Sequence, residues 1–143
     1  MKRLPAVLCS LLLALPMALP VAPASAATST SAPALKSGVF APPRAAPEIA
    51  LTASDGSAFR LSRYRGKLVV LEFGYTSCLE VCPVTLATLA HARRLLGAAA
   101  DKVQVVFVTV DPARDSAARL RAYLAAFDPG FIGVTGSAAE VDA

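Results

Sequence analysis

The stretch LVVLEFGYTSCLEVCPVTL, Leu68 to Leu86, decides the fold, because it joins an apolar run, a cysteine pair and a helix start. Its first part, Leu68–Phe73, is typical of a strand that is buried on both faces of a sheet. Residues 74–81 then form a loop. Pro83 favours a helix start, since a first-turn residue does not need its N–H. The pattern therefore predicts a strand, a loop and a helix over about Pro83–Leu96.

A second apolar run, Val103–Val110, predicts another buried strand after this helix. Because a strand-helix-strand crossover is almost always right-handed, we expect the two strands to be parallel neighbours. The cysteine loop then lies at the carboxyl end of the first strand. Ligand and catalytic sites of open α/β sheets collect at that edge.

The flanking segments complete an α/β prediction. Ile49–Leu61 alternates apolar and polar residues around the turn signal Asp55-Gly56, which predicts a β-hairpin. Residues 115–127 carry an apolar face at helical spacing, and Phe131–Val134 is a short strand candidate. The expected fold is a βαβ core preceded by a β-hairpin.

The first 26 residues have the layout of a secretory signal peptide: a basic start, an apolar segment over Leu4–Leu15 and the small-residue pattern Ala24-Ser25-Ala26. An uncleaved membrane anchor within residues 4–22 is the alternative. Cleavage would remove Cys9, Met1 and Met17. Export would place the remaining cysteines in an oxidising compartment.

Residues 27–47 are rich in Ala, Pro, Ser and Thr, which predicts a flexible linker before a domain over residues 48–143. The net charge of the whole chain is +4, and loss of Lys2 and Arg3 with the signal would lower it by two. The remaining charge is too weak and scattered to indicate nucleic-acid binding.

Cys78 lies in the loop, and Cys82 is expected at the N-cap of the helix. The free N–H groups and dipole of a helix start favour a thiolate, so Cys82 should ionise readily. The spacing lets both sulfurs face a common point. Three interpretations stay open: a structural disulfide, thiol–disulfide exchange, and binding of a soft ion such as Cu(I). The usual exchange motif has two intervening residues, whereas this pair has three.

Four other polar residues are candidates for the same site: Glu72, Glu80, His91 and Asp111. His91 would lie about 180° around the helix and about 13 Å along it from Cys82, so we expect it to face solvent. Glu72 is expected to face outward at the strand end, and Glu80 to be a loop carboxylate. Asp111 could orient a ligand or simply form the turn before Pro112.

From about Gly38 to Ala143 the chain resembles the Sco/SenC family, thioredoxin-like copper chaperones for cytochrome oxidase assembly. The resemblance is carried by FGYTSCLEVCPVTL and by VFVTVDPARDSAARLRAYLAAFDPGFIGVTGSAAEVDA. It implies that Cys78 and Cys82 bind copper and can cycle between dithiol and disulfide. The implied partner is the copper-bearing subunit of cytochrome c oxidase, or another copper protein. The implied location is the periplasm or the outer face of the bacterial inner membrane.

The chain departs from the family pattern in one respect. The family's third copper ligand, a later histidine, is absent, and so are the last strands and helix of a thioredoxin-like fold. We therefore interpret the chain as C-terminally truncated and expect an unpaired sheet edge, which favours aggregation. Copper held by Cys78 and Cys82 alone should be weakly held.

Peroxiredoxins also begin a helix with Val-Cys-Pro, but they need a threonine where this chain has Leu79.

The expected function is thus a copper chaperone without catalytic residues. The alternative is a thiol–disulfide oxidoreductase that uses the same Cys78 and Cys82.

Overall fold

The computed structural model describes Gly38 and residues 40–142. The chain divides into two units, residues 1–43 and residues 44–143. The expected signal peptide, its anchor alternative, Cys9, Met1, Met17 and most of the expected linker lie outside the described residues. Within the described part of the chain, no helix is long and apolar enough to cross a membrane.

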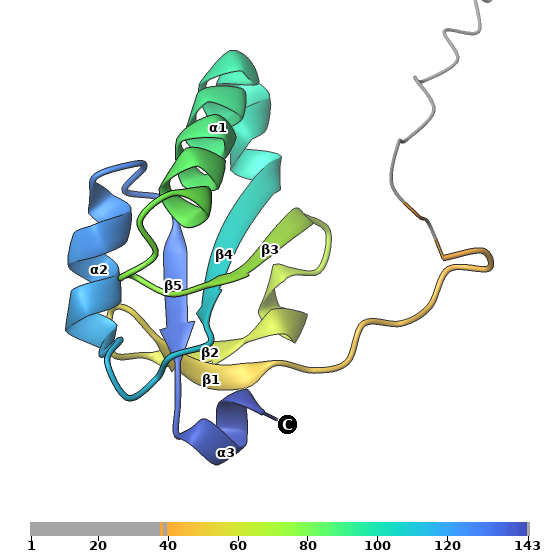
Figure 1. Cartoon of the computed structure of the whole chain (residues 1–143). Helices are drawn as coiled ribbons and strands as arrows, with labels where there is room; N and C mark the ends of the chain where they lie inside the picture. The colour runs from red at the N-terminus through yellow and green to blue at the C-terminus, as the bar shows by residue number, and fades with distance from the viewer. Residues whose placement is uncertain (1–37, 39, 143) are drawn as a thin grey trace, which may run out of the picture. The chain divides into compact units, whose positions relative to one another are not determined.

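The second unit is built on one five-stranded sheet with the strand order β2-β1-β5-β4-β3 (Figure 1). Strands β1 (Ala50–Ala53) and β2 (Ala58–Arg60) form the predicted antiparallel hairpin. Gly56 lies in its turn at φ +85°, a backbone conformation that a side chain disfavours. The hairpin joins the sheet through β1, which pairs antiparallel with β5 (Ile132–Thr135).

The predicted βαβ unit is present. Strand β3 (Leu68–Gly74) runs parallel to β4 (Val103–Thr109), and helix α1 (Val81–Leu95) connects them. Strand β5 is parallel to β4 on its other side. These pairings place the carboxyl ends of three strands at one edge of the sheet.

Shorter elements complete the unit. A 3-10 helix, η1 (Leu61–Tyr64), follows β2, and a second, η2 (Gly97–Lys102), follows α1. Helix α2 (Ala117–Ala125) lies between β4 and β5, and α3 (Ala138–Val141) comes last. A capping box between Ser137 and Glu140 begins α3.

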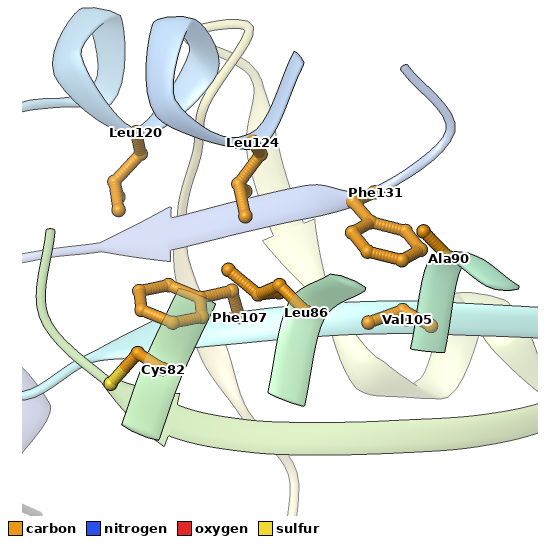
Figure 2. Packing of buried hydrophobic residues seen from close by; sticks show 8 residues of the cluster. All are labelled: Cys82, Leu86, Ala90, Val105, Phe107, Leu120, Leu124 and Phe131. Carbon is orange, nitrogen blue, oxygen red and sulfur yellow. The ribbon is translucent and has the colours of Figure 1, made fainter. Parts of the chain in front are cut away.

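The two faces of the sheet have separate apolar cores. Helices α1 and α2 cover one face, where β4 contributes Val105 and Phe107 (Figure 2). Alternate residues of the same strand, Val106 and Val108, point to the other face, where they pack with Phe59 of the hairpin. Strand β4 is therefore an interior strand that is buried on both faces.

Two predicted details are wrong. Strand β3 is not buried on both faces, because it forms an edge of the sheet, and Leu68 and Phe73 are 65% and 63% exposed. Helix α1 starts at Val81, two residues before Pro83, so Cys82 lies within its first turn. Among the described residues no strand pairs with the outer edge of β3, which matches the expected unpaired edge.

Candidate functional site

The two cysteines meet where β3 ends and α1 begins. After Gly74 the chain makes a tight turn, in which the Cys78 N–H donates to the carbonyl of Tyr75 at 3.1 Å. Cys78 is partly exposed at the end of this turn, whereas Cys82 is only 7% exposed. Figure 2 shows Cys82 beside Phe107 and Leu86 in the apolar core. One sulfur therefore faces the surface and the other lies in the core.

The structure brings the two sulfur-bearing residues together. The backbone N–H of Cys82 donates to the Cys78 sulfur over 3.5 Å. Both are free thiols. A spacing of four residues therefore places the pair at one point, at the edge of the sheet that the strand order predicts for a site.

The acidity of the pair differs from the expectation. The pKa of Cys78 is lowered, first by the backbone N–H of Cys82, then by the Cys82 thiol and the N–H of Glu80. The pKa of Cys82 is raised, chiefly because burial disfavours its thiolate. The prediction that Cys82 ionises readily is thus wrong. The free N–H groups at the start of α1 instead donate to the sulfur of Cys78, the cysteine that precedes the helix.

Glu72 does not face outward as expected. It shares the helix-covered face of the sheet with Val70, and its Oε2 is buried with no hydrogen-bond partner among the described residues. Burial raises the pKa of Glu72 to about 7. This carboxyl group also acts on Cys82, where its charge contributes to the raised thiol pKa. The site therefore has a titratable neighbour that was not assigned to it.

Tyr123 of α2 supplies a second polar group on this face. Its ring packs against Phe107 and Phe127, and its hydroxyl is buried without a partner among the described residues. The pKa of Tyr123 is raised to about 12, first by burial and then by the charges of the two thiols. The hydroxyl is therefore a neutral hydrogen-bond donor near the pair.

The remaining candidates have local roles. His91 is exposed on α1, as expected. Glu80 is exposed and is the N-cap residue of α1, and its backbone N–H, rather than its carboxylate, affects Cys78. Asp111 pairs with Arg114, and its carbonyl accepts from the backbone N–H groups of Arg114 and Asp115. It therefore forms the turn before α2.

Sequence reasoning missed the carboxylate that does reach the cysteine turn. Asp115 is fully buried and accepts hydrogen bonds from the backbone and side chain of Thr76, two residues before Cys78. Arg119 also bonds to this turn, through Thr76 and Ser77. The available signal was an Asp and an Arg one helical turn apart, beginning at the sheet edge that carries the cysteines.

This arrangement supports soft-metal binding or electron exchange. Two neighbouring cysteines provide two thiolate ligands, which select Cu(I) over hard ions. Among the described residues there is no group of three or more His, Cys, Asp or Glu side chains placed to hold a metal ion. The same pair can also lose two electrons and two protons and form a disulfide.

Comparison with known proteins gives a consistent picture. The SCO1/SenC family matches residues 41–143. A putative copper-binding protein of Stutzerimonas stutzeri is 37% identical over 98 residues, which are 66% of this chain and 47% of that protein. The mouse mitochondrial SCO2 homolog is 42% identical over 80 residues, or 54% of this chain and 31% of that protein. The chain thus spans less than half of the length of these curated relatives.

Solved structures agree with the fold. Copper-bound ScoI of Bradyrhizobium japonicum has 38% identity and a TM-score of 0.65, covering 67% of this chain and 61% of its own. Copper-bound yeast Sco1 has 34% identity and a TM-score of 0.63, with coverage of 67% and 61%. The fold is α/β and thioredoxin-like, as predicted. The match over most of the chain shows that it belongs to the SCO1/SenC family.

Proposed function

We propose that this domain is a copper chaperone that carries one Cu(I) ion between the thiolates of Cys78 and Cys82. The observation that carries the proposal is the hydrogen bond from the Cys82 N–H to the Cys78 sulfur, which brings two free cysteines together at the carboxyl edge of the sheet. Cu(I) binds well to two thiolates, and its binding releases the thiol protons. Two relatives of the same fold are described with copper bound.

The exposure of the pair suits delivery of the ion. Cys78 is partly exposed, and the neighbouring Leu79 is 96% exposed, so an acceptor protein can reach the outer sulfur. Release can then proceed by ligand exchange, in which acceptor groups replace one sulfur and then the other. The acceptor that the family resemblance implies is the copper-bearing subunit of cytochrome c oxidase, or another copper protein.

The placement of the domain is part of this proposal. Residues 1–26 would direct export as a cleaved signal or remain as an anchor, and residues 27–47 would tether the domain formed by residues 48–143. The domain would then act in the periplasm or at the outer face of the bacterial inner membrane. One solved relative, from Bacillus anthracis, is described as a lipoprotein of the family.

Thiol–disulfide exchange is the second candidate, and one observation favours it. The pair is asymmetric, with a partly exposed thiol of lowered pKa and a buried thiol of raised pKa. The Cys78 thiolate would attack a substrate disulfide and release one substrate thiolate. The Cys82 sulfur would then break the mixed disulfide, which releases the second substrate thiol and leaves a Cys78–Cys82 disulfide. The substrate gains two electrons and the pair loses two.

An anaerobic titration of the reduced full chain with Cu(I), against a chromophoric chelator, tests the proposal. We expect one Cu(I) per chain, and loss of binding in Cys78→Ser and Cys82→Ser. The control is Cys9→Ser, which should bind copper like the unchanged chain. Copper binding that survives loss of both Cys78 and Cys82 would contradict the chaperone function. Catalytic reduction of a disulfide peptide with dithiothreitol, without stable copper binding, would support the exchange function instead.

A further inference from the structure

A buried carboxylate connects α2 to the cysteine turn. Asp115 lies just before α2 and is fully buried. Its Oδ2 accepts from the Thr76 N–H at 2.9 Å and from the Thr109 hydroxyl at 2.7 Å. Its Oδ1 accepts from the Thr76 hydroxyl at 2.5 Å. Because a buried charge requires such partners, the turn and the carboxylate hold each other in place.

Arg119 closes this arrangement from the surface. Its Nε donates to the Thr76 hydroxyl at 2.6 Å and lies 3.7 Å from Asp115 Oδ1, while one terminal nitrogen donates to the Ser77 hydroxyl at 3.1 Å. The Thr76 hydroxyl therefore donates to Asp115 and accepts from Arg119. Both partners fix its orientation, and the guanidinium spans the two residues that precede Cys78.

The cysteine turn is thus held from two sides. On one side Asp115 and Arg119 hold Thr76 and Ser77. On the other side the first turn of α1 holds the Cys78 sulfur through the Cys82 N–H. Cys78 lies between these two attachments and belongs to no helix or strand, so the distance between the two sulfurs depends on both.

We propose that Asp115 and Arg119 are positioning residues, which clamp the Thr76–Cys78 turn at the spacing from Cys82 that lets the two thiols act as one unit. The proposal rests on the proposed function of the pair, because both copper binding and disulfide formation need the sulfurs to stay together. Loss of the clamp should lower the effective concentration of one thiol near the other. A Cys78–Cys82 disulfide should then form less readily.

The reversible oxidation of the pair by glutathione disulfide measures this effect without any metal. The two thiols lose two protons and two electrons, one S–S bond forms, and one glutathione disulfide becomes two glutathione thiols. All variants are made in the full chain with Cys9→Ser, so that only the pair reacts. We expect Arg119→Met and Thr76→Val to lower the equilibrium constant for disulfide formation about tenfold, which is about 30 mV for this two-electron couple.

Two controls separate positioning from general stability. Thr76→Ser keeps the hydroxyl and should stay within about twofold of the unchanged pair. Arg121→Met removes another exposed arginine of α2, which lies away from the turn beside the β1–β2 hairpin, and should have no effect. The melting temperature of each reduced variant is measured in parallel.

The outcomes are distinct. Arg119→Met and Thr76→Val are the clamp variants. If they lower the melting temperature but leave the glutathione equilibrium within about twofold, Asp115 and Arg119 only stabilise the fold and the proposal is wrong. A pair that forms only mixed disulfides with glutathione overturns it as well. If instead the unchanged chain fails to bind Cu(I) while the clamp variants shift the equilibrium as expected, the chaperone function fails and the clamp stands.

Discussion

The Cys82 sulfur lies so close to Gly74 that a Cβ atom on residue 74 would be 2.8 Å from it. The same Cβ would lie 2.9 Å from the ring of Phe107. Real Cβ atoms do not approach other atoms so closely, so the last residue of β3 must lack a side chain for Cys82 to occupy its place. The glycine before the cysteine turn is thus part of the site.

We expect Gly74→Ala to destabilise the reduced protein by about 1–3 kcal/mol, the usual cost of adding atoms to a packed core. The added methyl group must displace either the Cys82 sulfur or the Phe107 ring. Urea unfolding of the reduced chain measures the effect. Gly38→Ala is the control, because among the described residues no atom beyond its chain neighbours lies within 4 Å of the added Cβ. Equal stability of Gly74→Ala and the unchanged chain would contradict this packing.

The two thiols should differ strongly in reactivity. Cys78 is partly exposed and its pKa is lowered, first by the Cys82 N–H, whereas Cys82 is buried and its pKa is raised by that burial. Because the thiolate is the nucleophile, iodoacetamide at pH 7 should modify Cys78 at least about tenfold faster. Fragment ions of the tryptic peptide Leu68–Arg93, which contains both cysteines, identify the modified residue.

The same reaction in concentrated urea is the control for this difference. Unfolding removes both the helix N–H groups and the apolar core, so the two rates should converge. If Cys82 reacts first in the folded chain, or if the difference persists in urea, the proposed origin of the asymmetry is wrong.

The sequence predicted the elements that depend on local patterns. The hairpin around Gly56, the parallel β3 and β4 and the exposed His91 all follow from turn signals or periodicity. The burial of β3 could not be predicted from such patterns, because an edge strand and a central strand have the same apolar composition. Only the strand order shows that Phe73 lies at an edge.

The site was predicted in part for the same reason. The cysteine spacing indicated a pair of neighbouring sulfurs, and in the structure the Cys78 sulfur accepts a hydrogen bond from the Cys82 backbone N–H. The hydrogen bonds of Asp115 to Thr76 join residues 39 positions apart, which no local pattern reveals. Glu72 was misplaced because a strand assumed to be buried on both faces gives no reason to choose the face of its one carboxylate.

Glu72 should make stability depend on pH in an unusual direction. Its pKa rises from about 4.3 in an unfolded chain to about 7 in the folded protein. Between these values the unfolded chain carries the charge and the folded protein does not. Stability is therefore lost as pH rises through this window, and the loss is complete above about pH 7.

Replacement by glutamine removes this loss. Glu72→Gln should be more stable than the unchanged chain by about 1–2 kcal/mol at pH 8, below the full linkage value because the side chain is partly solvated. At pH 4 the two proteins should unfold alike. Urea unfolding of the metal-free, reduced chain at both pH values is the measurement. Glu80→Gln is the matched control, because Glu80 is exposed. A difference that is the same at both pH values would count against burial of the Glu72 carboxyl group.

Copper affinity should rise with pH, if copper binds as proposed. The Cys82 thiol has a raised pKa and keeps its proton at neutral pH, so Cu(I) must displace that proton. Release of one proton per ion makes the affinity rise about tenfold per pH unit, and the rise is steeper where Cys78 is also protonated. Competition with a chelator at pH 6.5, 7.5 and 8.5, corrected for the chelator's own protonation, measures the slope.

The ligand count follows from the same geometry. With Cys78 and Cys82 as the ligands, X-ray absorption of the Cu(I) form should show two sulfur neighbours, and a small thiol should exchange with the bound ion. His91→Ala should bind copper like the unchanged chain, because His91 is exposed on α1. A pH-independent affinity, or one tightly held Cu(II) ion with three protein ligands, would show that other groups of the chain complete the site.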